Sequence, residues 1–200
     1  MRRKEFEILD RKRIDEVLKT TEIGYLAFNG ADGWPRITPV NFAYDGRILW
    51  HGAIAGERFE CLQRDPRATF SAVSLQVYLP SHLLSPENAT CATAAFKCVV
   101  VRGRCLAVED PQEKCSILNR LMDKYQPEGR YKKIFPQDPM YAKIVKATGI
   151  FALTIEEVSG KFKLAQNKSK EDREKIISKL REMGSPANLT AAEEILKTLK

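Results

Sequence analysis

The sequence predicts a mainly β protein with flanking helices, an α+β chain in which about six strands run mostly antiparallel in a small barrel. Three observations lead to this fold class. Runs rich in β-forming residues follow one another with turn residues between them, and only single helices interrupt them. Asp45-Gly46 separates two such runs, and this dipeptide is the strongest short signal for a hairpin. The spacing of the strands with hairpins favours a small barrel over a doubly wound sheet, and no internal repeat or low-complexity segment occurs.

Helices are expected where a capping residue precedes an apolar stripe. At residues 10–19, Asp10 occupies the capping position, and Ile14, Val17 and Leu18 form one stripe. Further helices are expected at 56–66, 110–125 and 139–147, and two more begin near the C-terminus at Ser169 and Thr190. An acidic residue three positions after each of these two starts completes the capping box pattern, and Gly184 is well placed to end the first of them.

Strands are expected in six runs: 23–28, 36–44, 47–53, 67–80, 96–108 and 149–160. The Asp45-Gly46 turn predicts that residues 36–53 form an antiparallel pair. Pro39 has no N–H group to donate, so it should occupy a bulge or an unpaired position. Gly103 predicts a bend in the longest run. The fold thus has one barrel domain over residues 1–165, with a helical appendage over 166–200 that packs on the barrel or on a partner subunit.

The composition argues against several function classes. The formal net charge is +7, but the basic residues are mixed with acids, as in 11–19 and 169–179. This mixing is typical of solvated helix faces rather than of a nucleic-acid surface. No apolar run approaches the roughly 20 residues of a membrane span. The charged segment 1–13 is not followed by the apolar stretch of a secretory signal. We therefore expect a soluble, cytoplasmic protein without a nucleic-acid or membrane partner.

The five cysteines form no C-x-x-C pair, and their number is odd: Cys61, Cys91, Cys98, Cys105 and Cys115. In a cytosolic chain this pattern predicts free, partly buried thiols. The chain has two histidines, and neither has ligand spacing to a cysteine, so we expect no metal site.

One junction between a strand and a helix carries the residue types of an anion site. Small residues follow His51, and Gly56 and Arg58 stand at the predicted helix start. A helix N-terminus with exposed amides and a nearby cation binds anions, and an arginine can donate two hydrogen bonds to a phosphate. A flat ring that carries a phosphate, such as flavin mononucleotide (FMN), would suit this junction and the strand before it. The alternative is an ordinary turn with a surface arginine.

Four segments in order resemble one known family: "GYLAF" at 24–28, the long run 35–71, "FKCVVVRGRCLAVED" at 96–110 and "KFKLAQNKS" at 161–169. Together they are similar to the pyridoxamine 5′-phosphate oxidase-like, FMN-binding split-barrel superfamily, and within it to the nitroimidazole-resistance-related flavoproteins. The resemblance covers roughly residues 10–182. It implies a six-stranded split barrel and a homodimer that holds FMN at the subunit interface.

The resemblance also implies cofactor-binding residues. They are the strand residues Arg36, Ile37, Thr38, Pro39, Val40 and Asn41; the next strand's His51, Gly52 and Ala53; the phosphate-loop residues Gly56, Glu57 and Arg58; Lys97 and Cys98, on a strand that reaches the flavin, often from the partner; and Lys163, Gln166 and Asn167 of the "KLAQN" motif. His51 has an open alternative as a hydrogen-bonded structural histidine. Lys163 and Arg36 have an open alternative as surface charges.

The chain departs from the family pattern at three points. Glu57 stands where many relatives carry a basic residue, so we expect it to point away and to leave Arg58 and Arg36 as the charge partners. Cys98 replaces a Ser or Gln, and a thiol is a weak donor. The C-terminal substrate-binding ending of true pyridoxamine phosphate oxidases is absent, so vitamin B6 oxidation is not expected.

The resemblance implies a flavoprotein that transfers electrons or hydride through FMN to a small acceptor, such as a nitroaromatic or quinone-like compound. The cofactor carries such chemistry, and no catalytic side chain is assigned. One alternative is a non-catalytic flavin- or haem-binding sensor, for which His51 or His82 would be the histidine ligand. Another is a basic regulatory protein that meets nucleic acid through its C-terminal helices.

Overall fold

The computed structural model describes residues 1–199, and these form two compact units. Unit 1 comprises Met1–Val17, Val73–Val99 and the chain from Ser159 onward. Unit 2 comprises Leu18–Ala72 and Val100–Val158. The expected domain boundary after residue 165 stays a prediction.

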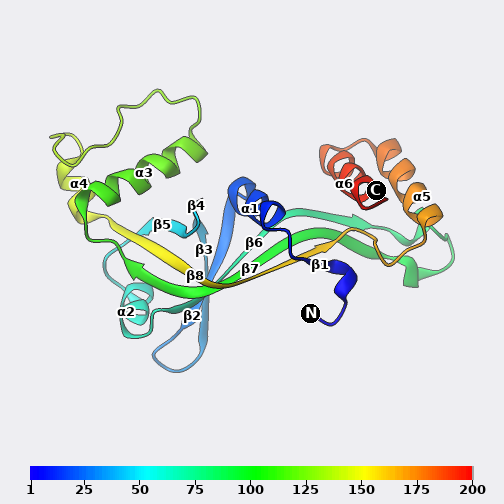
Figure 1. Cartoon of the computed structure of the whole chain (residues 1–200), viewed down its shortest axis with the longest axis horizontal. Coiled ribbons are helices and arrows are strands. Elements are labelled where there is room, and N and C mark those ends of the chain that lie inside the picture. The colour runs from blue at the N-terminus through cyan, green and yellow to red at the C-terminus, as the bar shows by residue number, and fades with distance from the viewer. Residues whose placement is uncertain (200) are drawn as a thin grey trace. The chain divides into compact units, whose positions relative to one another are not determined.

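One sheet of eight strands is present in the described residues: β1 (Glu7–Ile8), β2 (Ile23–Asn29), β3 (Pro35–Asn41), β4 (Ala43–Tyr44), β5 (Ile48–Gly52), β6 (Arg67–Leu79), β7 (Thr93–Ala107) and β8 (Gly149–Lys163). Its order is β3-β2-β6-β7-β8-β5-β4, and β1 also pairs with β8. β6, β7 and β8 are the long strands of Figure 1, and each contributes residues to both units. The prediction of a mainly β fold with antiparallel strands is confirmed. The count exceeds six because β1 and β4 have only two residues each.

The helices flank this sheet and were largely expected: α1 (Arg11–Thr20), α2 (Glu57–Arg64), α3 (Pro111–Tyr125), α4 (Ala142–Ala147), α5 (Lys170–Met183) and α6 (Pro186–Leu196), with short 3₁₀ turns η1 (Lys4–Phe6), η2 (Ser81–Leu83), η3 (Ala89–Cys91) and η4 (Lys197–Leu199). Asp110 caps α3 by accepting a hydrogen bond from the Glu113 amide at 2.7 Å. Ser169 caps α5 by accepting from the Asp172 amide at 3.0 Å, as predicted. None of the helices in residues 1–199 is long and apolar enough to cross a membrane.

The predicted start of the last helix at Thr190 is wrong. Gly184 ends α5 in the left-handed region, with φ 70°, and α6 begins directly afterwards. Ser185 is the N-cap, its hydroxyl accepts from the Asn188 amide at 3.2 Å, and Pro186 takes the first helical position. Thr190 lies inside the helix, where its hydroxyl donates to the Pro186 carbonyl at 2.9 Å. Ser-Pro is the stronger start signal because proline's fixed φ suits the first turn.

The predicted antiparallel pair over residues 36–53 is correct only at its tip. Ala43 and Tyr44 pair with β5, but the whole of β3 pairs with β2. The chain between β2 and β3 forms a tight turn of its own, in which Asp32 accepts from the Trp34 amide at 3.0 Å. β3 ends the strand order and is therefore an edge strand. An edge tolerates Pro39, which has no amide to donate.

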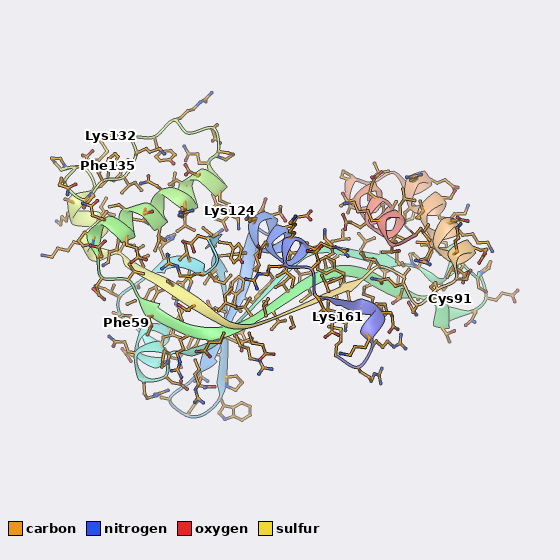
Figure 2. The ribbon with its side chains drawn as sticks, viewed as in Figure 1. Phe59, Cys91, Lys124, Lys132, Phe135 and Lys161 are labelled. Atoms are coloured by element: carbon orange, nitrogen blue, oxygen red, sulfur yellow. The ribbon has the colours of Figure 1, made fainter. Side chains whose placement is uncertain are left out.

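Unit 2 has an apolar core between α3 and the sheet. Buried residues of this core are Ala43, Leu49, Val108, Ile117, Leu121, Ile150 and Ala152. The end of α3 is held by polar contacts: Lys124 donates to the carbonyls of Thr21 and Phe42 at 2.6 and 2.9 Å, and the Tyr125 hydroxyl accepts from the Phe42 amide at 2.9 Å. Lys124 is labelled in Figure 2 at α3. These contacts fix the segment that follows β3.

Unit 1 contains the paired helices α5 and α6, drawn in orange and red in Figure 1. Each helix buries an apolar stripe, made of Ile176, Ile177 and Leu180 on α5 and of Ala191, Ala192 and Ile195 on α6. Glu194 of α6 forms a buried ion pair with Lys97 of β7, with Nζ and Oε2 3.2 Å apart. The C-terminal helices are thus tied to the sheet of their own unit.

Candidate functional site

A pocket of about 350 Å³ lies in unit 2 at the start of α2. Its lining residues come from β2, β3 and the junction between β5 and α2: Phe28, Arg36, Ile37, Thr38, Ala55, Gly56, Glu57 and Arg58. Six of these were predicted as cofactor-binding from the sequence, on two segments about 20 residues apart. The pocket therefore brings together the strand and the phosphate loop, as the prediction requires.

The floor of this pocket is backbone. Gly56 is the N-cap of α2, has φ 93°, and offers no side chain to cap the helix. An added Cβ there would meet no atom within 4 Å, so the space above Gly56 is open. Positive φ favours glycine at this position. The first amides of α2 therefore have no side-chain acceptor from the N-cap, and amides of this kind at a helix start can bind an anion.

Arg58 supplies the positive charge of the pocket. Its guanidinium lies over the Trp50 ring, 4.6 Å from the centroid, and Trp50 stacks on Phe151 at 4.1 Å. Phe59, labelled in Figure 2, meets Phe151 edge-on at 6.2 Å. Burial lowers the pKa of Arg58 from its usual value. Within residues 1–199 no carboxylate forms an ion pair with Arg58, so the aromatic stack holds a cation that lacks a counter-charge.

Gly52 makes room for this arginine. A Cβ added at Gly52 would lie 2.3 Å from Arg58 Nη2 and 3.2 Å from the Trp50 ring. A side chain at residue 52 would therefore displace the guanidinium. Gly52 therefore has a steric role toward Arg58, and its predicted contact with the cofactor stays a prediction.

Arg36 is in a different electrostatic state from Arg58. Its Nε donates to Glu57 Oε1 at 2.8 Å, and its Nη2 donates to Asp32 Oδ2 at 3.0 Å. The two carboxylates, Asp32 first, raise the pKa of Arg36. The expectation that Glu57 points away is therefore wrong, because Arg36 attracts it into the pocket. Arg36 is neutralised by these two acids, and Arg58 remains the unpaired cation.

The other predicted residues of unit 2 lie on the same two segments. Pro39 and Asn41 are exposed on β3, and Val40 between them is buried, as alternation along a strand requires. His51 is exposed at the end of β5 and pairs in register with Ile150 of β8; Ala53, just after the strand, is also exposed.

The remaining predicted residues belong to unit 1. Lys97 is buried and paired with Glu194, and Cys98 next to it is half-buried. Lys163 donates to the Thr93 hydroxyl. Gln166 uses its amide within its own turn, since it accepts from the Leu164 amide at 2.6 Å and donates to the Phe162 carbonyl at 2.7 Å. Lys163 and Asn167 line a second pocket in this unit.

A family model described as pyridoxamine 5′-phosphate oxidase matches residues 10–162. The chain belongs to this family. Among curated proteins no significant sequence match to the chain is found. The match includes all the predicted site residues from Arg36 to Cys98, and it ends just before Lys163.

Solved structures of this fold are similar to the chain at low sequence identity. A candidate 5-nitroimidazole antibiotic resistance protein from Bacteroides thetaiotaomicron has a TM-score of 0.64 at 20% identity, covering 78% of this chain and 86% of that one. A flavocytochrome from Azotobacter vinelandii has a TM-score of 0.67 at 24% identity, covering 84% and 74%. An FAD- and haem-binding protein from Mycobacterium smegmatis has a TM-score of 0.66 at 22% identity, covering 83% and 78%. The resemblance to the split-barrel superfamily and the predicted fold class are confirmed.

The α2 pocket of this family member fits the phosphate end of a flavin. The fit rests on the unpaired Arg58, on the open space above Gly56 and on the uncapped amides of α2. Within residues 1–199, no group of three or more His, Cys, Asp or Glu side chains could hold a metal ion.

Sequence reasoning missed the residues that set the charge of this pocket. Asp32 partners Arg36, and Trp50 and Phe151 support Arg58. The spacing of Asp32 four residues before Arg36 was visible in the sequence, but it lies in a turn, where helical spacing has no meaning. The Trp50–Phe151 stack joins two strands that are far apart in the chain, and no local sequence pattern predicts it.

Proposed function

We propose that this chain is a flavoprotein that binds FMN in the pocket at the start of α2. The observation that carries the proposal is Arg58, a half-buried guanidinium without a carboxylate partner, beside the open backbone of Gly56. An anion with several acceptor oxygens would supply both the missing counter-charge and acceptors for the α2 amides. A terminal phosphate meets these requirements.

The edge strand β3 would hold the flavin ring. Residues 36–41 form a free edge, so their outward amides and carbonyls are available to the polar edge of a flat ring. Thr38 adds a hydroxyl in the same pocket. His51, exposed at the end of β5, would lie on the side of the ribityl chain, as the family resemblance implies. Lys97, Cys98, Lys163, Gln166 and Asn167 stay family-based predictions.

We infer an oxidoreductase role for the bound flavin. When bound, FMN supplies hydride or electron transfer, and the protein binds it and shapes access to it. No side chain of the pocket is assigned as an acid or a base. A small acceptor of nitroaromatic or quinone-like chemistry is proposed by analogy with the candidate nitroimidazole resistance protein. A true pyridoxamine phosphate oxidase activity is not proposed.

We also propose a homodimer in which a second copy covers the β2–β3 pair. Cross-strand register puts Tyr25 opposite Pro39, and Ala27 opposite Ile37, on one face. On that face Ile37 is 71% exposed, Tyr25 51% and Ile23 49%. An exposed apolar strip beside a ligand pocket is typical of a subunit interface. A Tyr25→Glu variant should shift the molar mass measured by light scattering from dimer to monomer; an unchanged mass would contradict this interface.

Haem is the second candidate ligand, because two of the similar structures are named for a haem as well as a flavin. The observation that favours it here is His51, an exposed histidine free to serve as an axial ligand. The visible spectrum of the purified protein distinguishes haem from flavin.

The deciding experiment is the visible spectrum of the purified protein, followed by acid release and identification of the chromophore. The proposal expects two flavin bands and about one FMN per chain after reconstitution. A strong Soret band lost in His51→Ala would support haem instead. A protein that is colourless and does not bind added FMN would contradict the proposal.

A further inference from the structure

Unit 1 contains a second pocket, which, within residues 1–199, shares no lining residue with the pocket at the start of α2. It has a volume of about 220 Å³ and is formed by the end of β6, η2, η3, the start of β7, the turn after β8 and α5. One part of the lining is apolar and includes Leu79, Leu83, Leu84 and Ile176. Another part carries the cations Arg3, Lys163 and Lys168.

The cations of this pocket lack an acidic partner within it. Among the described residues that line the pocket, none is Asp or Glu. Lys163 donates to the Thr93 hydroxyl, which is neutral. Burial, and after it the like charges of Lys161 and Arg3, lower the pKa of Lys163. Like charges that gather in a partly buried place repel one another, and a bound anion would relieve the repulsion.

The turn that follows this lysine is closed by hydrogen bonds. Ala165, which lines the pocket, has φ 61°, an unusual value for a residue with a side chain. Gln166 keeps the turn in place by bonding the Leu164 amide and the Phe162 carbonyl at 2.6 and 2.7 Å. The Lys168 amide donates to the Ala165 carbonyl at 2.9 Å. Gln166 thus positions the turn beside the pocket.

We propose that this pocket binds a small organic anion with an apolar body, such as an aromatic or short-chain carboxylate, in place of the flavin contacts that the family resemblance implies for Lys163 and Asn167. Lys163 and Arg3 would hold the carboxylate, while Leu83, Leu84 and Ile176 would enclose the apolar body. Charge alone would suit inorganic phosphate, but the leucines and the isoleucine add apolar surface that favours an organic molecule.

Alkylation of Cys91 reports directly on ligand binding in this pocket. It lines the pocket, is half-buried and is labelled in Figure 2. Cys98, equally half-buried, does not line it and serves as an internal reference. The FMN-loaded protein is treated with the neutral reagent iodoacetamide, and the alkylation rate at each cysteine is followed by mass spectrometry. The probes are benzoate, its neutral analogue benzamide, and inorganic phosphate.

Benzoate at about ten times its Kd should slow alkylation of Cys91 by about tenfold and leave Cys98 unchanged. Benzamide and phosphate at the same concentration should protect Cys91 much less. Lys163→Met should abolish the protection. Lys161→Met, two positions earlier on β8 and outside the pocket lining, should retain it.

Several results would overturn the proposal. If benzamide protects Cys91 as well as benzoate does, the pocket binds apolar molecules without selecting an anion. If phosphate protects Cys91 as well as benzoate does, the pocket binds anions without selecting an apolar body. If FMN slows alkylation of Cys91 in the flavin-free protein, the pocket is part of the flavin site. No protection by any probe would leave it without a ligand. A protein that binds no FMN but shows the benzoate effect would refute the proposed function and retain this inference.

Discussion

Two cations of this protein, Arg58 in unit 2 and Lys97 in unit 1, were predicted to serve the same ligand, and their surroundings differ. Arg58 lies over an aromatic ring with no carboxylate partner in the described chain. Lys97 is only 8% exposed and pairs with Glu194, which is 7% exposed. Removing the partner of a buried, paired cation destabilises the fold, whereas a cation without a partner is available to an anion. The counter-charge, more than the residue type, distinguishes these two cations, and a flavin contact of Lys97 stays a prediction.

The largest effect is expected from breaking the Lys97–Glu194 pair. Glu194→Ala leaves the Lys97 ammonium buried and unpaired, so the free energy of unfolding should fall by roughly 3–5 kcal/mol. Urea denaturation followed by circular dichroism measures this change. Glu193→Ala, on the same helix but exposed, is the matched control.

A double variant sharpens this test. Lys97→Met with Glu194→Met replaces both charges by apolar side chains and should restore most of the lost stability. If Glu194→Ala is as stable as the wild type, Lys97 is not held as a structural cation, and the contrast with Arg58 fails.

The next effect concerns the space that Gly52 leaves for Arg58. Gly52→Ala puts a methyl group 2.3 Å from the Arg58 Nη2 position, so the guanidinium must move. FMN affinity, measured by quenching of flavin fluorescence, should fall about tenfold, the loss of one charged hydrogen bond. Adding Gly52→Ala to Arg58→Ala should cost nothing further, because the group that it displaces is gone. Additive losses would show that Gly52 acts independently of Arg58.

A smaller gain is expected when the acid beside the phosphate site is neutralised. Glu57→Gln removes a negative charge from the pocket and leaves Arg36 with Asp32 as its remaining carboxylate. FMN should then bind a few times more tightly, about the size of an exposed ion-pair effect. Glu60→Gln, on the same helix and outside the pocket lining, controls for net charge. Weaker FMN binding in Glu57→Gln would mean that Glu57 positions Arg36 for the ligand.

A pH-dependent effect is expected from Lys124, a cation held by carbonyl oxygens rather than by a carboxylate. Burial lowers its pKa from the usual 10.5 to about 8. Between these pH values the unfolded chain holds a proton that the folded chain has lost, so the free energy of unfolding should rise with pH. Unfolding at pH 7.5 and 10 measures the rise, which should be smaller in Lys124→Met. An equal rise in both proteins would assign it to other groups.

The sequence predicted the parts of the molecule that local patterns determine. Two helices begin at the predicted caps Asp110 and Ser169, and α5 ends at Gly184 as expected, because capping depends on residues within one turn. Gly56 and Arg58 of the α2 pocket were predicted from their place at a helix start, whereas Arg36, Ile37, Thr38 and Glu57 were predicted from the family resemblance.

The sequence could not choose between competing local signals or foresee distant partners. Two turn signals flank β3, and the one before it determined its pairing. Ser185-Pro186 prevailed over Thr190 as a helix start. The Lys97–Glu194 pair and the Asp32–Arg36–Glu57 group depend on the tertiary fold, which no residue pattern within one element encodes.

The most direct test of the central claim compares FMN with riboflavin, which lacks the phosphate, on the wild type and on Arg58→Ala. The wild type should prefer FMN by about tenfold to a hundredfold, the effect of charged hydrogen bonds to the phosphate. Arg58→Ala should lose most of that preference while its affinity for riboflavin stays the same, and Arg64→Ala, at the far end of α2, should keep it. Equal binding of both flavins by the wild type, or an unchanged preference for FMN in Arg58→Ala, would contradict the claim that Arg58 binds the FMN phosphate.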